Sequence, residues 1–213
     1  MAQSKAPPFT LYEYRPSPFC VAVRIALNEV KTQFTPREVD LKKPRTAAFL
    51  KRSPFGRLPA LVEHRPGGEL AIFESPAILL YLADRFPDST LGFSDITSRG
   101  EGYSWLSYIS SGFADELWKV LHESKVYEED ERSIAVLERS KSELERHLEV
   151  LDKHLARRAY LSGDYSPADT LATPLLDLLD HVDIEFDAYP RVRAWRERLR
   201  DRPSYKDVWP HDD

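Results

Sequence analysis

The first half of the chain alternates short apolar segments with segments of helical periodicity. Ala22, Ile25 and Ala26 recur at the spacing of one helix face, soon after the apolar residues 9–14. Farther on, apolar runs flank Arg-Pro-Gly-Gly at 65–68, a composition typical of a hairpin turn. The predicted elements are a strand at 9–14, a helix at 18–30, a strand at 34–41, a short helix at 46–52, strands at 60–64 and 69–74, and a helix that follows Ser75-Pro76.

The order of these elements, β-α-β-α-β-β-α, determines the kind of sheet. A β-α-β opening pairs its two strands in parallel, because the helix carries the chain back to the same end of the sheet, whereas a hairpin pairs its strands antiparallel. We therefore predict an α/β domain with a mixed, four-stranded sheet over residues 1–87. Pro36 favours an edge position for the second strand, since proline cannot donate a ladder hydrogen bond.

The strand signals end at residues 88–97, which are rich in Pro, Gly, Ser and Asp and are predicted to be a linker. After it, Ser166 and Asp169 have the spacing of a capping box at the start of a helix. We expect residues 98–213 to form an all-helical domain. Its other helices are predicted at 98–124, 132–158 and 189–202, the second with an apolar stripe of Ile134, Leu137, Leu144, Leu148, Leu151 and Leu155.

Composition adds mainly exclusions. The 213 residues are 42% hydrophobic and 31% charged, as in ordinary globular proteins, and the net charge of −5 favours neither nucleic acid nor an anionic membrane. No apolar run approaches the length of a membrane span, and residues 1–8 lack the apolar core of a signal peptide. A single cysteine permits no internal disulfide. We expect a cytoplasmic protein without nucleic-acid or membrane partners.

Ser17 and Pro18 are the first candidates for chemistry. Serine is a favoured N-cap, and proline is a favoured first residue of a helix. A hydroxyl in that position faces unpaired backbone N–H groups and the positive end of the helix dipole. Such a turn can hold an anion, including a thiolate. Taken alone, the same two residues are also explained by simple helix capping.

Four segments in this order resemble the cytosolic glutathione transferase family, and the likeness spans roughly residues 9–209. The resemblance implies a thioredoxin-like first domain that binds glutathione, a helical second domain that contributes the electrophile site, and a homodimer. The same fold also carries non-enzymes. The segments are Ser17-Pro18-Phe19-Cys20 with residues 23–27, similar to the active-site turn of the serine-type classes and most closely of the plant tau class; residues 53–61, similar to the loop before a cis-proline; residues 73–78; and Ser166-x-x-Asp169.

The resemblance gives Ser17 the catalytic role, as hydrogen-bond donor to the sulfur of bound glutathione. A free thiol has a pKa of about 8.5, and lowering it by about two units needs roughly 2.7 kcal/mol in favour of the anion. One hydrogen bond to a charged group supplies roughly 1.5–3 kcal/mol, and a helix N-terminus adds about 0.3–1 kcal/mol. One serine at a helix cap is therefore about sufficient to activate the thiol.

The resemblance also implies a cradle for the rest of glutathione. Leu58 and Pro59 would be joined by a cis peptide bond, which turns the Leu58 backbone toward the cysteinyl part. Glu74 would face the ammonium group, and Ser75 would receive the γ-glutamyl carboxylate at a helix N-terminus. The basic candidates for the glycyl carboxylate are Arg57, Lys43 and Arg45.

The electrophile pocket is expected in the first long helix of the second domain, although packing in the core explains its aromatic residues equally well. The six histidines show no metal-ligand spacing, so no metal is predicted. The arginine-rich segment 191–202 also contains acidic residues and is predicted to be a solvated face. The candidate pocket residues are Tyr108, Ser111, Phe113 and Trp118.

Cys20 follows Ser17 like the second cysteine of a Cys-x-x-Cys motif whose first cysteine is replaced. Because a hydroxyl attacks disulfides poorly, this favours a small buried apolar role for Cys20 over thiol–disulfide exchange. The leading hypothesis is conjugation of glutathione to a hydrophobic electrophile, as in detoxification. The alternatives are a glutathione-dependent peroxidase or isomerase, a thiol transferase that uses Cys20, and a non-catalytic interaction protein resembling the bacterial stringent starvation protein A.

Overall fold

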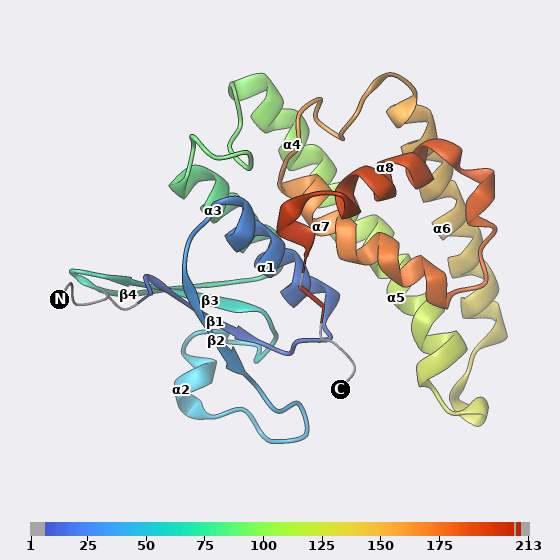
Figure 1. Ribbon diagram of the computed structural model, residues 1–213. Coiled ribbons are helices and arrows are strands. Elements are labelled where there is room, and N and C mark those ends of the chain that lie inside the picture. Colours follow the sequence, from blue (N-terminus) through green and yellow to red (C-terminus); the bar gives the residue numbers. More distant parts are fainter. Residues whose placement is uncertain (1–6, 207, 210–213) are drawn as a thin grey trace. The chain divides into compact units, whose positions relative to one another are not determined.

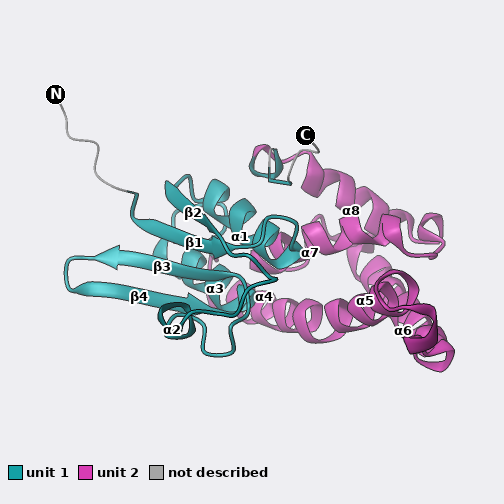
Figure 2. Ribbon diagram, turned by 90° about the horizontal axis from the view of Figure 1, so that it is seen from below, with its two compact units in different colours: residues 1–92, 204–213 teal, residues 93–203 magenta. Residues whose placement is uncertain are grey.

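The computed structural model describes residues 7–206, 208 and 209, and the chain divides into two compact units. Unit 1 comprises Met1–Gly92 and Ser204–Asp213, and unit 2 comprises Phe93–Pro203 (Figure 2). This division resembles the predicted one, with a junction inside the expected linker, but it differs at the C-terminal end.

The described residues after Pro203 pack in unit 1, whereas we expected them in the helical part. The side-chain amide of Asn28 donates to the Ser204 carbonyl at 3.1 Å. Val208 joins Val21 and Ile25 in a buried apolar cluster. These contacts are long-range in sequence, and no periodicity around residue 204 predicts them.

A mixed sheet forms the centre of unit 1, with strand order β2-β1-β3-β4 (Figure 1). Strand β1 (Phe9–Glu13) pairs in parallel with β2 (Phe34–Glu38) and antiparallel with β3 (Ala60–Arg65). Strand β4 (Gly68–Phe73) completes the hairpin with β3. The predicted mixed, four-stranded sheet is confirmed, with the proline-containing strand β2 at an edge.

Helices cover both faces of this sheet. Successive strand residues point to opposite faces, so Phe9 and Tyr12 of β1 place an aromatic ring on each face for a helix to cover. Helices α1 (Pro18–Glu29) and α3 (Ser75–Arg85) pack against each other, on the side where Phe9 contacts Phe86. On the other face, the short helix α2 (Ala47–Leu50) brings Phe49 to Tyr12, with their ring centroids 5.6 Å apart. The predicted helix positions are therefore confirmed, although α2 is shorter than expected.

Unit 2 is helical, as predicted, but its first long helix is not regular. The segment predicted at 98–124 forms α4 (Ile96–Tyr108) and α5 (Ala114–Leu121), joined by a π-helical turn at Ile109–Phe113 and followed by a second one at His122–Val126. The turn contains Gly112, where an added Cβ would lie 2.9 Å from the His147 ring. The remaining helices are α6 (Ile134–His154), α7 (Pro167–Asp177) and α8 (Pro190–Arg200).

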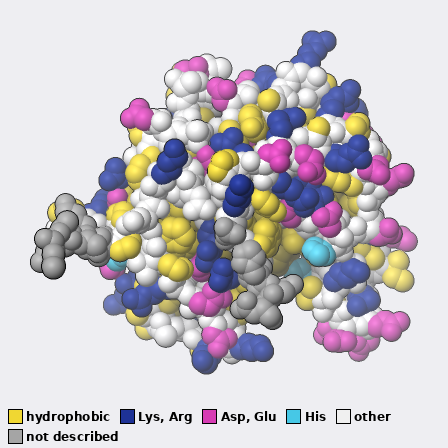
Figure 3. Space-filling view, in the orientation of Figure 1, with side chains coloured by type: hydrophobic (Ala, Val, Ile, Leu, Met, Phe, Trp, Pro, Cys, Tyr) yellow, Lys and Arg dark blue, Asp and Glu magenta, His cyan; other side chains and the backbone are white. Residues whose placement is uncertain are grey.

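Four of the five arginines of α8 form ion pairs with aspartates from neighbouring segments. Arg191 pairs with Asp152 at 2.7 Å, and the Arg200 Nε bonds Asp177 at 2.8 Å. Arg196 is buried rather than solvated, so the prediction of a fully solvated face is wrong for this residue. Figure 3 shows acidic and basic side chains interspersed on the visible surface, consistent with local charge compensation.

Helix α7 lies in the core of unit 2 and depends on the buried carboxylate of Asp169. Ser166 is the N-cap, and its backbone N–H donates to Asp169 at 3.0 Å, so the predicted capping box is confirmed. The backbone of Leu161 and the indole of Trp195 also donate to this carboxylate, each at 3.0 Å. The Asp169 carboxylate therefore also links α7 to α8 and to the loop that precedes α7.

We predict that Asp169→Asn lowers the free energy of unfolding at pH 7 by about 3 kcal/mol, because an amide nitrogen then faces donors that now bind a carboxylate. Asp164→Asn, at an exposed position, should change it by less than about 0.5 kcal/mol. Urea unfolding followed by circular dichroism measures both changes. Equal stability of the Asp169→Asn variant and the wild type would contradict this role.

The pH dependence gives a second readout of the same variant. Burial raises the pKa of Asp169 from 3.8 to about 6, against its hydrogen bonds, which lower it. As the pH falls, Asp169 is therefore protonated in the folded protein at a higher pH than in the unfolded chain. The stability that this protonation adds is lost again as the pH rises through the folded pKa. The stability difference between wild type and Asp169→Asn should widen from about pH 7 to about pH 4. A narrowing difference would be inconsistent with the raised pKa.

Candidate active site

Ser17 lies in the turn between β1 and α1 and is the N-cap of α1, with Pro18 as the first helical residue, as predicted. Its backbone is extended, with φ −71° and ψ 124°, and its carbonyl accepts from Val21 N–H at 2.9 Å. Its hydroxyl makes no capping hydrogen bond to the helix backbone, although the Ser17 side chain hydrogen-bonds the Cys20 thiol. The half-buried hydroxyl is therefore not consumed by the capping role that the residue type suggests.

An ion pair holds the two ends of this turn together. Glu13, the last residue of β1, is fully buried and receives both the Nε and an Nη donor of Arg24 on α1, the former at 2.6 Å. Burial raises the pKa of Glu13, while Arg24 lowers it. Sequence reasoning missed this pair, although a carboxylate at the end of an apolar strand was a signal for it.

Strand register brings the predicted glutathione residues of unit 1 to one end of the sheet. Tyr12 pairs with Ala60, and Ala60 pairs with Phe73. The segments that follow Tyr12, precede Ala60 and follow Phe73 therefore meet at the same edge. These segments contain, respectively, Ser17; Arg57, Leu58 and Pro59; and Glu74 and Ser75.

The loop before β3 is held by hydrogen bonds to its own backbone. The Leu58–Pro59 peptide bond is cis, as predicted. The buried Ser53 hydroxyl donates to the Arg57 carbonyl at 2.8 Å. Gly56 has φ +73°, a left-handed conformation that favours glycine. The backbone N–H and C=O of Leu58 therefore lie in a loop that these hydrogen bonds hold in place.

The three basic candidates for the glycyl carboxylate differ in how they are already engaged. Arg45 donates to the Gly56 carbonyl at 3.0 Å and to two further backbone carbonyls, so it organises the loop. Lys43 pairs with Asp40 at 3.3 Å. Arg57 stacks on the exposed ring of Phe55 at 4.6 Å and has no ion pair within the described part of the chain. Arg57 is therefore the most available of the three.

The junction of β4 and α3 differs from the prediction by one residue. Ser75 was expected as the N-cap, but Glu74 has this position, because its carbonyl accepts the first helical hydrogen bond from Ile78 N–H at 3.0 Å. Glu74 has φ +65° and ψ 120°, a strained conformation for a residue with a Cβ. Strain of this kind is often found at ligand-binding positions.

Cys20 is fully buried at the first turn of α1. Burial raises the pKa of its thiol to about 11, outweighing hydrogen bonds from the Tyr14 backbone and the Ser17 side chain. Because the thiolate is the reactive form, this cysteine has little nucleophilic character near neutral pH. The interpretation of Cys20 as a small buried apolar residue agrees with these values.

The four electrophile-pocket candidates occupy different environments in unit 2. Phe113 is fully buried, and the Tyr108 hydroxyl lies 2.6 Å from His147 Nδ1 on α6. Ser111 is exposed and donates to the Ser107 carbonyl at 2.7 Å. Trp118 is exposed and stacks near His122. Packing accounts for Phe113 and Tyr108, whereas Ser111 and Trp118 remain accessible on the helix surface.

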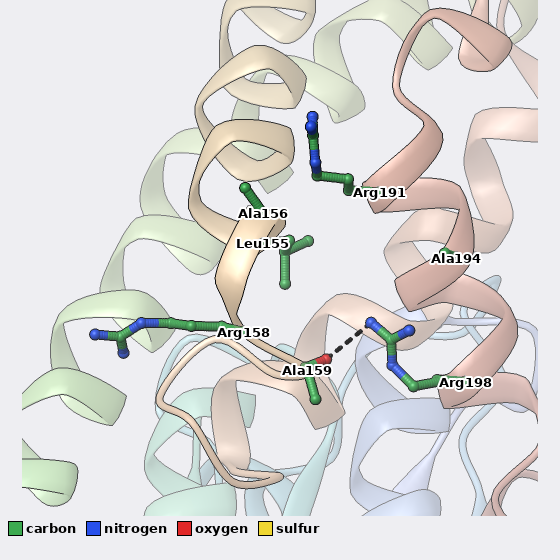
Figure 4. Close-up of a pocket in the computed structure, with 7 residues that line it drawn as sticks. All are labelled: Leu155, Ala156, Arg158, Ala159, Arg191, Ala194 and Arg198. Carbon is green, nitrogen blue, oxygen red and sulfur yellow. Dashed lines mark hydrogen bonds between the residues drawn. The ribbon is translucent and has the colours of Figure 1, made fainter.

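A pocket of about 280 Å³ lies in unit 2 between the end of α6 and α8 (Figure 4). Its arginines do not converge: Arg158 points away from Arg191, and Arg198 donates to the Ala159 carbonyl at 3.0 Å. None of the predicted site residues lines it. Among the described residues, no three His, Cys, Asp or Glu side chains are grouped as metal ligands, and no helix is both long and apolar enough to cross a membrane.

An α/β unit of this topology, with a polar site at one end of its sheet and a helical unit after it, defines a two-domain thioredoxin-like protein. The chain matches the glutathione S-transferase N-terminal domain over residues 7–84 and the glutathione S-transferase C-terminal domain over residues 113–203. It belongs to the glutathione S-transferase family, and it is a glutathione transferase. The predicted family, fold and enzyme class are confirmed.

Its relatives include enzymes with different named activities. The disulfide-bond oxidoreductase YfcG of Escherichia coli K12 is 33% identical over 90% of both chains. The probable glutathione S-transferase GSTF2 of Oryza sativa subsp. japonica is 31% identical over 89% of this chain and 88% of its own. A solved glutathione transferase family member from Pseudomonas fluorescens, with two glutathione molecules bound, is 30% identical with a TM-score of 0.85, over 97% of this chain and 94% of its own.

We predict that Glu74→Gly separates folding strain from ligand binding. Glycine adopts positive φ freely, so the free energy of unfolding should rise by about 1 kcal/mol. If Glu74 binds the ammonium group of glutathione, as the family resemblance implies, the KM for glutathione should rise about tenfold, because that charged partner is lost. Denaturant unfolding and steady-state kinetics measure the two effects.

Lys31→Gly is the matched control, since Lys31 is the other described non-glycine residue with positive φ, at 51°, and lies outside the predicted cradle. It should gain stability with no change in KM. An unchanged KM in Glu74→Gly would remove Glu74 from the binding site.

Proposed function

We propose that this glutathione transferase activates the thiol of glutathione through Ser17 and conjugates it to a hydrophobic electrophile. The observation that carries the proposal is the Ser17 hydroxyl: it lies at the N-cap of α1, makes no capping bond to the helix backbone, and hydrogen-bonds a sulfur atom, the Cys20 thiol. The neighbouring backbone edge at cis-linked Leu58 and the junction at Glu74 and Ser75 lie at the same end of the sheet. This arrangement supports a site for an extended tripeptide with a thiol at its centre.

Each part of glutathione then has a partner of suitable chemistry. The cysteinyl backbone pairs with Leu58 as an added strand would. Ser75 at the start of α3 receives the γ-glutamyl carboxylate, and Glu74 faces the ammonium group. Arg57 receives the glycyl carboxylate, because Arg45 is committed to backbone carbonyls. These contacts hold the sulfur close to Ser17.

The reaction itself needs little covalent participation from the protein. The bound thiol loses its proton to solvent, and the Ser17 hydroxyl donates a hydrogen bond to the resulting thiolate. The sulfur then forms a bond to an electrophilic carbon, and a leaving group such as chloride departs. Positioning and stabilisation of the sulfur anion supply the rate enhancement. Ser111 and Trp118 are the accessible candidates for electrophile contacts, in an enzyme that we expect to be a cytoplasmic homodimer.

Ser17→Ala should lower kcat/KM for glutathione with 1-chloro-2,4-dinitrobenzene by about 10- to 100-fold, the value of one hydrogen bond to a charged group. The pKa of the bound thiol, measured by ultraviolet absorption of the thiolate, should rise by about one to two units. Thr35→Ala, which removes an exposed hydroxyl from β2, should change neither quantity. A wild-type complex whose thiol ionises as it does in buffer would refute the mechanism.

A second candidate is glutathione-dependent disulfide reduction, favoured by the named activity of the Escherichia coli relative. Activated glutathione attacks a disulfide, forms a mixed disulfide and releases one thiol. A second glutathione attacks the mixed disulfide, which yields oxidised glutathione and the second thiol. The electrons come from the two glutathione molecules, so no protein cysteine takes part.

We therefore expect Cys20→Ala to retain any activity with 2-hydroxyethyl disulfide, whereas Ser17→Ala loses it about tenfold or more. The buried, high-pKa thiol of Cys20 is the reason. The assay follows oxidised glutathione through glutathione reductase and NADPH. Loss of activity in a folded Cys20→Ala variant would instead assign the thiol a direct part.

A further inference from the structure

Unit 1 contains a polar cavity of its own, distinct from the pocket in unit 2. It lies on the face of the sheet that α2 covers. Its volume is about 390 Å³, within the range of small-molecule sites. Strand register puts Thr10, Tyr12 and Arg37 on this face, because Tyr12 pairs with Arg37 and alternate residues share a side. The lining residues are Thr10, Tyr12, Arg37, Thr46, Ala48, Phe49, Arg52, His64 and Glu69.

One wall of the cavity is a fixed row of polar groups. Thr10 Oγ1 lies 2.8 Å from His64 Nε2, and His64 Nδ1 lies 3.4 Å from a Glu69 oxygen. The other Glu69 oxygen accepts from Arg52 Nη2 at 2.9 Å. The charge of Glu69 is therefore already compensated by Arg52 within the wall.

Two guanidinium groups line the cavity. Arg52 is ion-paired with Glu69, and its Nη1 donates to the Ala48 carbonyl at 3.0 Å, but both guanidinium groups keep N–H donors for a ligand. Arg52 Nε is buried and has no hydrogen-bond partner, and a buried donor without a partner is costly unless a ligand or water satisfies it. Arg37 lies on the edge strand, and within residues 7–206, 208 and 209 no carboxylate lies at ion-pair distance from it. A guanidinium group is the protein's best match for a planar or tetrahedral oxyanion.

The lining also contains two aromatic rings. Tyr12 and Phe49 have ring centroids 5.6 Å apart, and the Arg52 guanidinium lies over the Tyr12 ring at 5.4 Å. A ligand that satisfies this cavity therefore combines an anionic group with an apolar or aromatic body. None of its lining residues belongs to the predicted glutathione cradle.

We propose that this cavity is a second ligand site, for a small organic oxyanion with an aromatic or apolar body, either a carboxylate or a phosphate ester. The anionic group binds Arg37 and the free Nε–H of Arg52, and the body packs on Tyr12 and Phe49. The site is independent of glutathione binding, and it does not rest on the activity proposed for Ser17.

Titration of the ¹⁵N-labelled protein with benzoate and with phenyl phosphate tests this proposal by NMR. Saturable shifts are expected at the amides of Thr10, Arg37 and Glu69, with the same affinity when glutathione is present. Inorganic phosphate should bind about tenfold more weakly, because it lacks the aromatic body. The stronger of the two organic probes identifies the preferred anionic group.

Arg37→Gln should weaken the organic probe about tenfold, whereas Lys51→Gln, which removes an equally exposed charge outside the lining, should not. Both variants should keep the activity with 1-chloro-2,4-dinitrobenzene, which verifies their folding. Three results would each overturn the proposal: no saturable shifts, an equal loss in both variants, or displacement of the probe by glutathione.

Discussion

A buried carboxylate at the end of β1 determines how the turn that contains Ser17 is built. Glu13 has no exposure, and its charge is tolerable only because Arg24 on the following helix binds both of its oxygens. The pair spans the segment that contains Ser17, so it fixes where α1 begins relative to the strand. Breaking it would leave an uncompensated buried charge at the start of the turn that contains Ser17.

The neighbouring strand repeats this solution with a different helix. Glu63 on β3 is buried, and it accepts from the Tyr81 hydroxyl and from Arg85 Nε, both on α3. Burial alone would raise the pKa of Glu63, but Tyr81 and Arg85 hold it below its usual value. Both active-site helices, α1 and α3, are thus tied to the sheet by charged pairs, which are more directional than apolar contacts. This directionality suits a site whose groups come from three loops.

The two thiol-related positions of the active-site turn have opposite physical roles. Ser17 has a hydroxyl at a helix N-terminus that makes no capping bond to the helix backbone, and a helix N-terminus stabilises an anion. Cys20, one turn later, is buried, where an anion is disfavoured and its pKa rises to about 11. In the proposed mechanism, the turn therefore favours the thiolate of a bound ligand over that of Cys20. Both reactions proposed for this protein, conjugation and disulfide reduction, are compatible with this difference, because neither needs a reactive cysteine of the protein.

The sequence by itself determined the order of elements, the mixed sheet, the Ser17 N-cap and the Ser166–Asp169 capping box, whereas the cis bond at Leu58–Pro59 was predicted only from the family resemblance. These features depend on local chemistry: periodicity, proline geometry and short-range hydrogen bonds, together with motifs at fixed spacing. Only the tertiary structure decided that Glu74, not Ser75, caps α3, that Arg45 is committed to its loop, that π-helical turns interrupt the first long helix of unit 2, and that the residues after Pro203 pack in unit 1. The Glu13–Arg24 pair and the second cavity belong to this group as well. Each depends on side chains from separate elements meeting in space, and a linear pattern holds no record of such distances.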